Sequence, residues 1–107
     1  MTVKQLSATD LQQKLAQNEA LFLLDVREVT EFDYTHIANS VLIPLKQVPD
    51  RLNELNPDLE IIVICHHGMR SQQAASYLVH SGFKNVANLS GGIDAWSCQC
   101  DPTVKRY

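Results

Sequence analysis

Short apolar runs alternate with amphipathic stretches along the chain, a pattern typical of strands and helices that build a parallel sheet. Strands are expected at residues 3–6, 20–25, 40–43, 60–64 and 85–89. The run at 20–25 is almost wholly apolar, which indicates a strand buried on both faces. The run at 60–64 (Glu-Ile-Ile-Val-Ile) is the clearest strand. The pattern predicts an α/β fold around a central five-stranded parallel sheet.

Helices are expected between these strands, at residues 8–17, 28–34, 45–55, 70–81 and from 91 to about 96. Ser7, followed by Asp10 three positions later, is typical of a helix start. Pro49 lies inside the third helical pattern, so we expect a kink or a split there. Gly82 is suited to end the long helix at 70–81. Right-handed crossovers would place the helices on both faces of the sheet.

Length and composition favour one ordinary globular domain over residues 1–107. The chain has 45% apolar and 20% charged residues, so its core needs no disulfide or metal to fold. The net charge is −3 and no long basic run occurs, which argues against nucleic acid or an anionic membrane as partner. The apolar runs are too short to span a bilayer, and residues 1–7 lack the layout of a signal peptide. We therefore expect a cytoplasmic protein.

The three cysteines are Cys65, Cys98 and Cys100. An odd number without a signal peptide argues against a disulfide framework, so at least one thiol is expected to be free. We expect Cys98 and Cys100 to be ordinary thiols, with a resolving pair or half of a metal site as the alternative. No residues nearby complete a ligand set, so no metal site is predicted.

The most informative segment is the loop from Cys65 to Arg70, which lies between the clearest strand and the long helix. Ligands of parallel sheets bind beyond the carboxyl ends of the strands, where this loop begins. A short loop that contains Gly68 and enters a helix N-terminus can direct its free N–H groups at an anion. Such a site favours a thiolate or a persulfide anion. The alternative is that Cys65 is a small buried apolar residue.

The segment Cys-His-His-Gly-Met-Arg-Ser at 65–71 resembles the active-site loop of the rhodanese family, which often reads Cys, two variable residues, Gly, one variable residue, Arg and Ser. Further matching segments follow the family order: Leu24–Glu28 with Glu31-Phe32, His36-Ile37 with Ile43-Pro44, and Gly91–Ile93 with Trp96 and Pro102. The resemblance covers essentially the whole chain. Four positions depart from the family pattern: Thr35, Ala38, Asn39 and Cys100. Asn39 tolerates a positive φ, so the turn there can survive.

The resemblance implies a rhodanese-like three-layer fold and a sulfurtransferase of the thiosulfate type. Cys65 would be the nucleophile that takes the outer sulfur of thiosulfate or of a persulfide and passes it to cyanide or a thiol. The expected acceptor is a thiol, for example glutathione or a thioredoxin-like protein. No cofactor is implied.

The same resemblance implies roles for the residues around Cys65. The substrate-binding loop would comprise His66, His67, Gly68, Met69, Arg70 and Ser71, whose backbone N–H groups stabilise the persulfide. Arg70 would either contact the donor or shape the loop, and we expect at most one of the two histidines to reach the pocket. Asp25 and Arg27 are expected to support the loop rather than to catalyse. Trp96 is expected in the core, and His36 is expected to fix a turn.

Two other functions compete with sulfur transfer. Cysteine-dependent phosphatases also use a loop from Cys to Arg at a helix N-terminus, but their loop is one residue longer than the four residues found here. A shorter loop should suit a sulfur atom better than a phosphoryl group, and Ile64 rather than His precedes the cysteine. A non-catalytic rhodanese-like binding or regulatory module is the other alternative, and it is typical of domains in which the cysteine is replaced.

Overall fold

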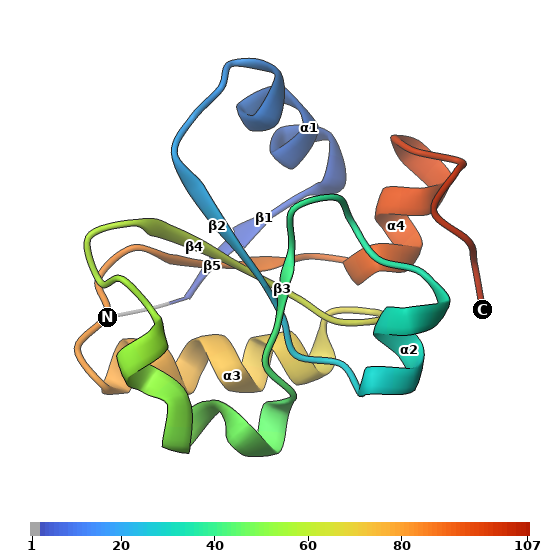
Figure 1. The fold of residues 1–107 in the computed structure, drawn as a ribbon. Helices are drawn as coiled ribbons and strands as arrows, with labels where there is room; N and C mark the ends of the chain where they lie inside the picture. The colour runs from blue at the N-terminus through green and yellow to red at the C-terminus, as the bar shows by residue number, and fades with distance from the viewer. Residues whose placement is uncertain (1–2) are drawn as a thin grey trace.

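A computed structural model describes residues 3–107 as five short strands, four α-helices and one 3-10 segment (Figure 1). In chain order these are β1 (Lys4–Leu6), α1 (Ala8–Ala16), β2 (Leu21–Asp25), α2 (Val29–Tyr34), β3 (Val41–Leu42), η1 (Leu45–Glu54), β4 (Glu60–Ile64), α3 (Met69–His80), β5 (Val86–Leu89) and α4 (Gly92–Gln99). The signal-peptide prediction concerns residues 1–7, of which 1 and 2 lie outside the described residues.

All five strands are parallel and lie in the order β1-β5-β4-β2-β3. The central strand β4 pairs with β2 on one side and with β5 on the other. The predicted α/β fold with a five-stranded parallel sheet is therefore confirmed. No helix within residues 3–107 has the length and apolar character needed to cross a membrane.

Helices cover both faces of the sheet, as predicted: α1 and α4 lie on one face, and α3 and η1 on the other (Figure 1). The two faces follow from the alternation of side chains along β4. Ile61, Val63 and Cys65 belong to the core beneath α3, whereas Ile62 and Ile64 belong to the opposite core. Cys65 is thus the last residue of a buried row that faces the long helix.

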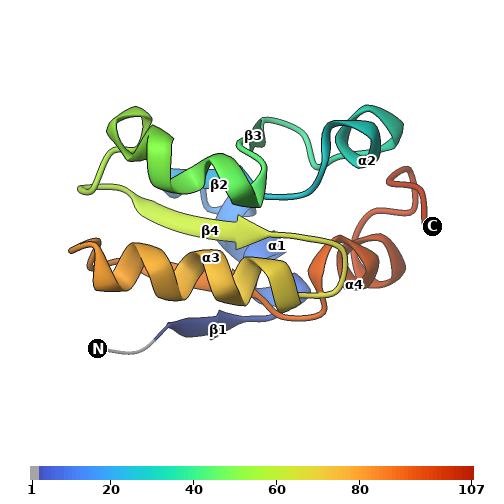
Figure 2. The same ribbon diagram turned by 90° about the horizontal axis from the view of Figure 1, so that it is seen from below.

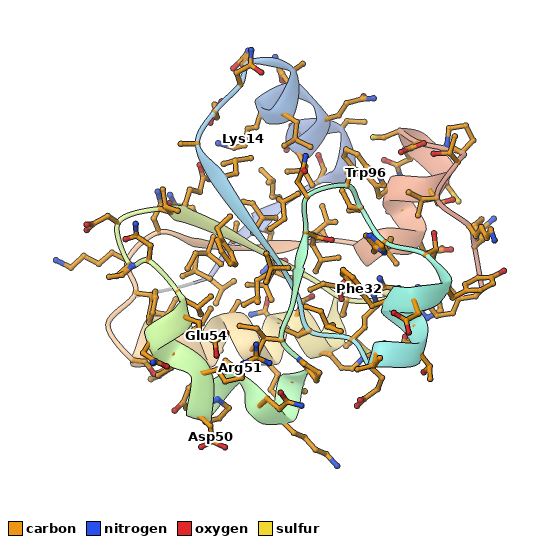
Figure 3. The ribbon with its side chains drawn as sticks, in the orientation of Figure 1. Lys14, Phe32, Asp50, Arg51, Glu54 and Trp96 are labelled. Atoms are coloured by element: carbon orange, nitrogen blue, oxygen red, sulfur yellow. The ribbon has the colours of Figure 1, made fainter. Side chains whose placement is uncertain are left out.

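Trp96 belongs to the core between α1 and α4, as predicted (Figure 3). The start of α1 is also as predicted, because the Asp10 N–H donates to Ser7 Oγ at 3.1 Å. Asn39 has a φ of 68°, so the turn before β3 is made without the glycine common in the family. Thr35 also departs from the family pattern, and its Oγ1 accepts a hydrogen bond from the Lys105 N–H at 2.9 Å.

Two predicted helices differ from those observed. The segment at 45–55 is a 3-10 segment, and its backbone leaves the helical conformation at Arg51, not at Pro49. Proline is tolerated where a helical turn begins, since its missing N–H is not needed there. The Arg51 side chain bonds to Gln47 and to Glu54, across the break (Figure 3). The last helix continues past Trp96 to Gln99.

Candidate active site

The carboxyl ends of β2, β4 and β5 meet at one edge of the sheet and bring three polar residues together. Asp25 is the last residue of β2, Cys65 follows β4, and Asn88 lies next to the last residue of β5. The register pairs Asp25 with Ile64 and Val63 with Asn88. This edge is where parallel sheets bind their ligands.

The sulfur of Cys65 is buried, and one amide N–H and one hydroxyl oxygen face it. The Cys65 residue is 1% exposed, its Sγ accepts the Gly68 N–H at 3.1 Å, and Ser71 Oγ lies 3.3 Å from it. Gly68 has a φ of 103°, a left-handed conformation that turns its amide back toward the sulfur. Within residues 66–71, all of them described, the Gly68 amide alone donates to the resting sulfur. The predicted role of the other loop amides, which is to stabilise the outer sulfur of a persulfide, stays a prediction.

A buried polar network on β5 holds these groups in place. Ser71 is fully buried and hydrogen-bonds to Asn88 Oδ1. The Asn88 amide nitrogen donates to the Gly68 carbonyl at 3.2 Å and to Gln5 Oε1 at 3.0 Å. The sequence analysis missed Asn88 and Gln5. Asn88 could have been found because it is a polar residue inside the apolar strand at 86–89, where burying an unpaired amide costs free energy.

The start of α4 packs against the backbone of the loop. The Cys65 carbonyl accepts the Ile93 N–H at 2.8 Å, and the His66 carbonyl accepts the Asp94 N–H at 3.1 Å. A Cβ on Gly92 would lie 2.5 Å from the Cys65 oxygen and 2.4 Å from the His66 oxygen. Only glycine allows α4 to approach this closely.

Arg27 and Asp25 form a fully buried ion pair beside the loop. The guanidinium bonds to both carboxylate oxygens, at 2.7 Å for the shortest contact, and Asp25 also accepts the Arg27 backbone N–H at 3.0 Å. Burial is the largest single effect and lowers the pKa of Arg27, but the hydrogen bonds and charges of Asp25 and Tyr107 together outweigh it, so the pKa is raised. Arg27 also donates to the Thr35 carbonyl at 2.7 Å and to the Tyr107 hydroxyl at 2.9 Å. It reaches the loop through these neighbours, and its supporting role stays a prediction.

Arg70 forms a two-pronged ion pair with Glu31 on α2, and the N···O distances are 2.7 and 2.9 Å. Glu31 also accepts the Glu28 N–H at 3.1 Å and the Tyr107 hydroxyl at 2.7 Å. The hydrogen bonds from Arg70 are the largest cause that lowers the pKa of Glu31, from an ordinary 4.5 to about 2, and the same pair raises the pKa of Arg70. Arg70 is thus paired with α2, and whether it shapes the loop or contacts a donor stays a prediction. Glu31 was identified from the sequence only as a family match, and Tyr107 was assigned no role.

The two loop histidines lie in different surroundings. The His66 ring is half-buried and stacks on Tyr107, with centroids 3.9 Å apart and planes at 8°. Burial lowers the pKa of His66, and the neighbouring charge of His67 adds to the effect. His67 is exposed, and Met69 is 82% exposed. Whether either histidine meets a substrate stays a prediction.

The other singled-out residues lie away from the sulfur contacts. His36 bonds through Nδ1 to the Phe32 carbonyl at 2.8 Å, which fits the predicted turn-fixing role. Cys98 is exposed and Cys100 partly exposed, and neither is in a disulfide. Within residues 3–107 no three His, Cys, Asp or Glu side chains gather where they could hold a metal ion.

Comparison with known proteins agrees with this geometry. A model of the rhodanese-like domain matches residues 7–99. The chain belongs to the rhodanese-like domain family. A protein named "Sulfurtransferase" from Allochromatium vinosum is 35% identical over 102 residues, which are 95% of each chain. The "Thiosulfate sulfurtransferase GlpE" of Pseudoalteromonas translucida is 34% identical over 93 residues, 87% of this chain and 89% of that one. The crystal structure of a rhodanese-like domain protein from Staphylococcus aureus has a TM-score of 0.86 at 30% identity, and the match covers 98% of this chain and 99% of that one.

The close approach of α4 to the rhodanese-like loop predicts an asymmetry between two glycines. Gly92→Ala should lower the free energy of unfolding by roughly 1–3 kcal/mol more than Gly82→Ala, as measured by urea denaturation. Both residues have a positive φ, but a Cβ on Gly82 would meet nothing within 4 Å. Equal losses in the two variants would show that the loop does not need this contact.

The ion pair of Glu31 predicts a pH-dependent contribution to stability. The pKa of the Glu31 carboxyl is lower in the folded state than in the unfolded chain. The stabilisation is therefore complete above pH 4.5 and is lost as the pH falls toward 2. The gap in unfolding free energy between the native protein and Glu31→Gln should be largest near neutral pH and should shrink by about pH 3. Glu54→Gln, in an exposed pair, should show a smaller gap than Glu31→Gln at neutral pH, because solvent screens the pair. A gap for Glu31→Gln that does not change with pH would contradict the pairing.

Proposed function

We propose that the protein is a sulfurtransferase in which Cys65 carries a sulfane sulfur from thiosulfate or a persulfide donor to a thiol or cyanide acceptor. The observation that carries the proposal is the hydrogen bond from the Gly68 N–H to the buried Cys65 Sγ, at 3.1 Å. A buried sulfur that faces a fixed N–H donor at a helix N-terminus is suited to exist as an anion. The names of the two relatives, sulfurtransferase and thiosulfate sulfurtransferase, support the same reaction class.

In the first step the Cys65 thiolate attacks the outer sulfur of thiosulfate. A new S–S bond forms, the old one breaks, and sulfite leaves with the electron pair of the broken bond. In the second step an acceptor thiolate or cyanide attacks the outer sulfur of the Cys65 persulfide. The Cys65 thiolate then leaves with its electron pair and is ready for another cycle.

The loop supports both steps through charge stabilisation. The negative charge lies on Cys65 Sγ before loading and on the outer sulfur of the persulfide afterwards, so a loop that already presents N–H groups needs little reorganisation. Helix α3 begins at Met69, and its N-terminus adds a positive dipole end. Ser71, inside the first turn of α3, holds its hydroxyl oxygen 3.3 Å from Cys65 Sγ and donates its proton to Asn88. The burial of Cys65 favours donors with a protruding sulfur and acceptors with a protruding nucleophilic atom.

The expected partners follow from this reaction. The acceptor is proposed to be a thiol such as glutathione or a thioredoxin-like protein in the cytoplasm. Exposed His67 and Met69 flank the site where such a partner would approach. Arg70 is proposed to hold the loop in its resting form, because Glu31 occupies both of its terminal nitrogens.

Intact mass spectrometry after incubation with thiosulfate tests the proposal. The native protein should gain one sulfur atom and lose it on treatment with cyanide. Cys65→Ala should gain none, whereas Cys98→Ser should behave like the native protein, because Cys98 is exposed and lies outside the loop. A native protein that stays unloaded, or a Cys65→Ala variant that is still loaded, would refute the proposal.

A further inference from the structure

The segment after α4 returns to the active site. The C-terminal end of the chain lies beside α2 and α4 in both ribbon views (Figures 1 and 2). Two contacts fix this path: the Lys105 N–H donates to Thr35 Oγ1 at 2.9 Å, and Arg106 pairs with Asp94 at 2.9 Å. The family model matches residues 7–99, so Tyr107 lies outside the matched segment.

Tyr107, in this segment, touches three parts of the active site at once. Its ring stacks on His66 of the loop. Its hydroxyl accepts a hydrogen bond from Arg27 Nη1 at 2.9 Å and donates one to Glu31 Oε2 at 2.7 Å. Because the Arg27 N–H supplies the first bond, the single hydroxyl proton of Tyr107 is directed at the carboxylate.

The hydroxyl completes the coordination of the Glu31 carboxylate. Oε1 accepts bonds from Arg70 Nη1 and from the Glu28 N–H, and Oε2 accepts bonds from Arg70 Nη2 and from the Tyr107 hydroxyl. An ionised carboxylate offers about four acceptor positions, so these contacts fill it. The carboxylate is thereby held against Arg70, one residue before the first-turn residue Ser71.

We propose that Tyr107 is a positioning residue that holds the Glu31 carboxylate on Arg70 and thereby limits how strongly Arg70 attracts an anionic sulfur donor. Glu31 occupies both terminal nitrogens of Arg70 and neutralises its charge. An anion that approaches Cys65 must therefore compete with Glu31. Loss of the Tyr107 hydroxyl removes one of the four bonds that keep the carboxylate there, so Arg70 becomes more available to anions.

Alkylation of Cys65 measures this effect without sulfur transfer. Iodoacetate is an anion and iodoacetamide is neutral, so the ratio of their rates reports the local attraction for anions. Tryptic peptide 52–70 contains Cys65 as its only cysteine, and Cys98 and Cys100 lie in peptide 85–105, which serves as an internal reference. The proteins to compare are native, Tyr107→Phe and Tyr34→Phe. Tyr34 is a matched control, because its ring meets Tyr107 edge-on and its hydroxyl makes no hydrogen bond within residues 3–107.

The ratio at Cys65 should rise about two- to fivefold in Tyr107→Phe, less than the full effect of losing a hydrogen bond to a charged group, because Glu31 keeps its other three bonds. It should stay unchanged in Tyr34→Phe and rise at least as much in Glu31→Gln. In an Arg70→Ala background, where the tryptic peptide with Cys65 extends to residue 84, Tyr107→Phe should have no effect. A merely structural role of Tyr107 would change both reagents alike and leave the ratio unchanged.

The proposal is overturned if the rate ratio of iodoacetate to iodoacetamide at Cys65 is the same in Tyr107→Phe as in the native protein. This holds whether the ratio in Glu31→Gln is raised or unchanged. Glu31→Gln tests the same carboxylate if Tyr107→Phe fails to fold, and a native ratio there would also refute the idea. The consequence for donors rests on the proposed function: KM for thiosulfate should fall in Tyr107→Phe at unchanged kcat. If no sulfur loads onto Cys65 but the ratio rises, the proposed function fails and the role of Tyr107 stands.

Discussion

The hydrogen bond from the Gly68 N–H to Cys65 Sγ is the interaction on which the rest of the site depends. A sulfur that is 1% exposed cannot carry charge without donors, because the cost of burying an unpaired anion is large. The left-handed Gly68 turns its amide toward the sulfur, and Asn88 holds the carbonyl of the same residue. Gly92 allows α4 to close on the other side of the loop. The loop, β5 and the start of α4 therefore fix one amide together.

A second level of organisation surrounds this core of the site. Two arginine–carboxylate pairs, Asp25–Arg27 and Glu31–Arg70, are joined through the Tyr107 hydroxyl. Buried ion pairs add little net stability, because desolvation offsets their attraction, but they fix geometry. Here they hold β2, α2 and the loop in one arrangement. The charges of both arginines are neutralised nearby, so the proposed anion on Cys65 would be stabilised by the Gly68 amide rather than by a free guanidinium.

The fold and the position of Cys65 could be predicted from the sequence because both depend on local patterns. The apolar run at 60–64 defines the central strand, and the loop that follows it has the spacing of a family motif. Asn88, Glu31 and Tyr107 act through contacts with residues that are 17, 39 and 76 positions away, and no periodicity carries that information. The break in η1 was misplaced for a similar reason. Pro49 is a strong local signal, but the backbone departs from the helix at Arg51, whose side chain contacts Gln47 and Glu54.

The central claim is that the Gly68 amide stabilises a charged sulfur on Cys65. Proton–nitrogen correlation NMR spectra, recorded before and after alkylation of Cys65 with iodoacetamide, test it directly. Alkylation converts Cys65 Sγ from the proposed thiolate into an uncharged thioether. The account predicts that the Gly68 amide proton lies at lower field in the unmodified protein than in the alkylated one, because a hydrogen bond to an ion is shorter and stronger. A Gly68 amide proton that does not move on alkylation would contradict the account.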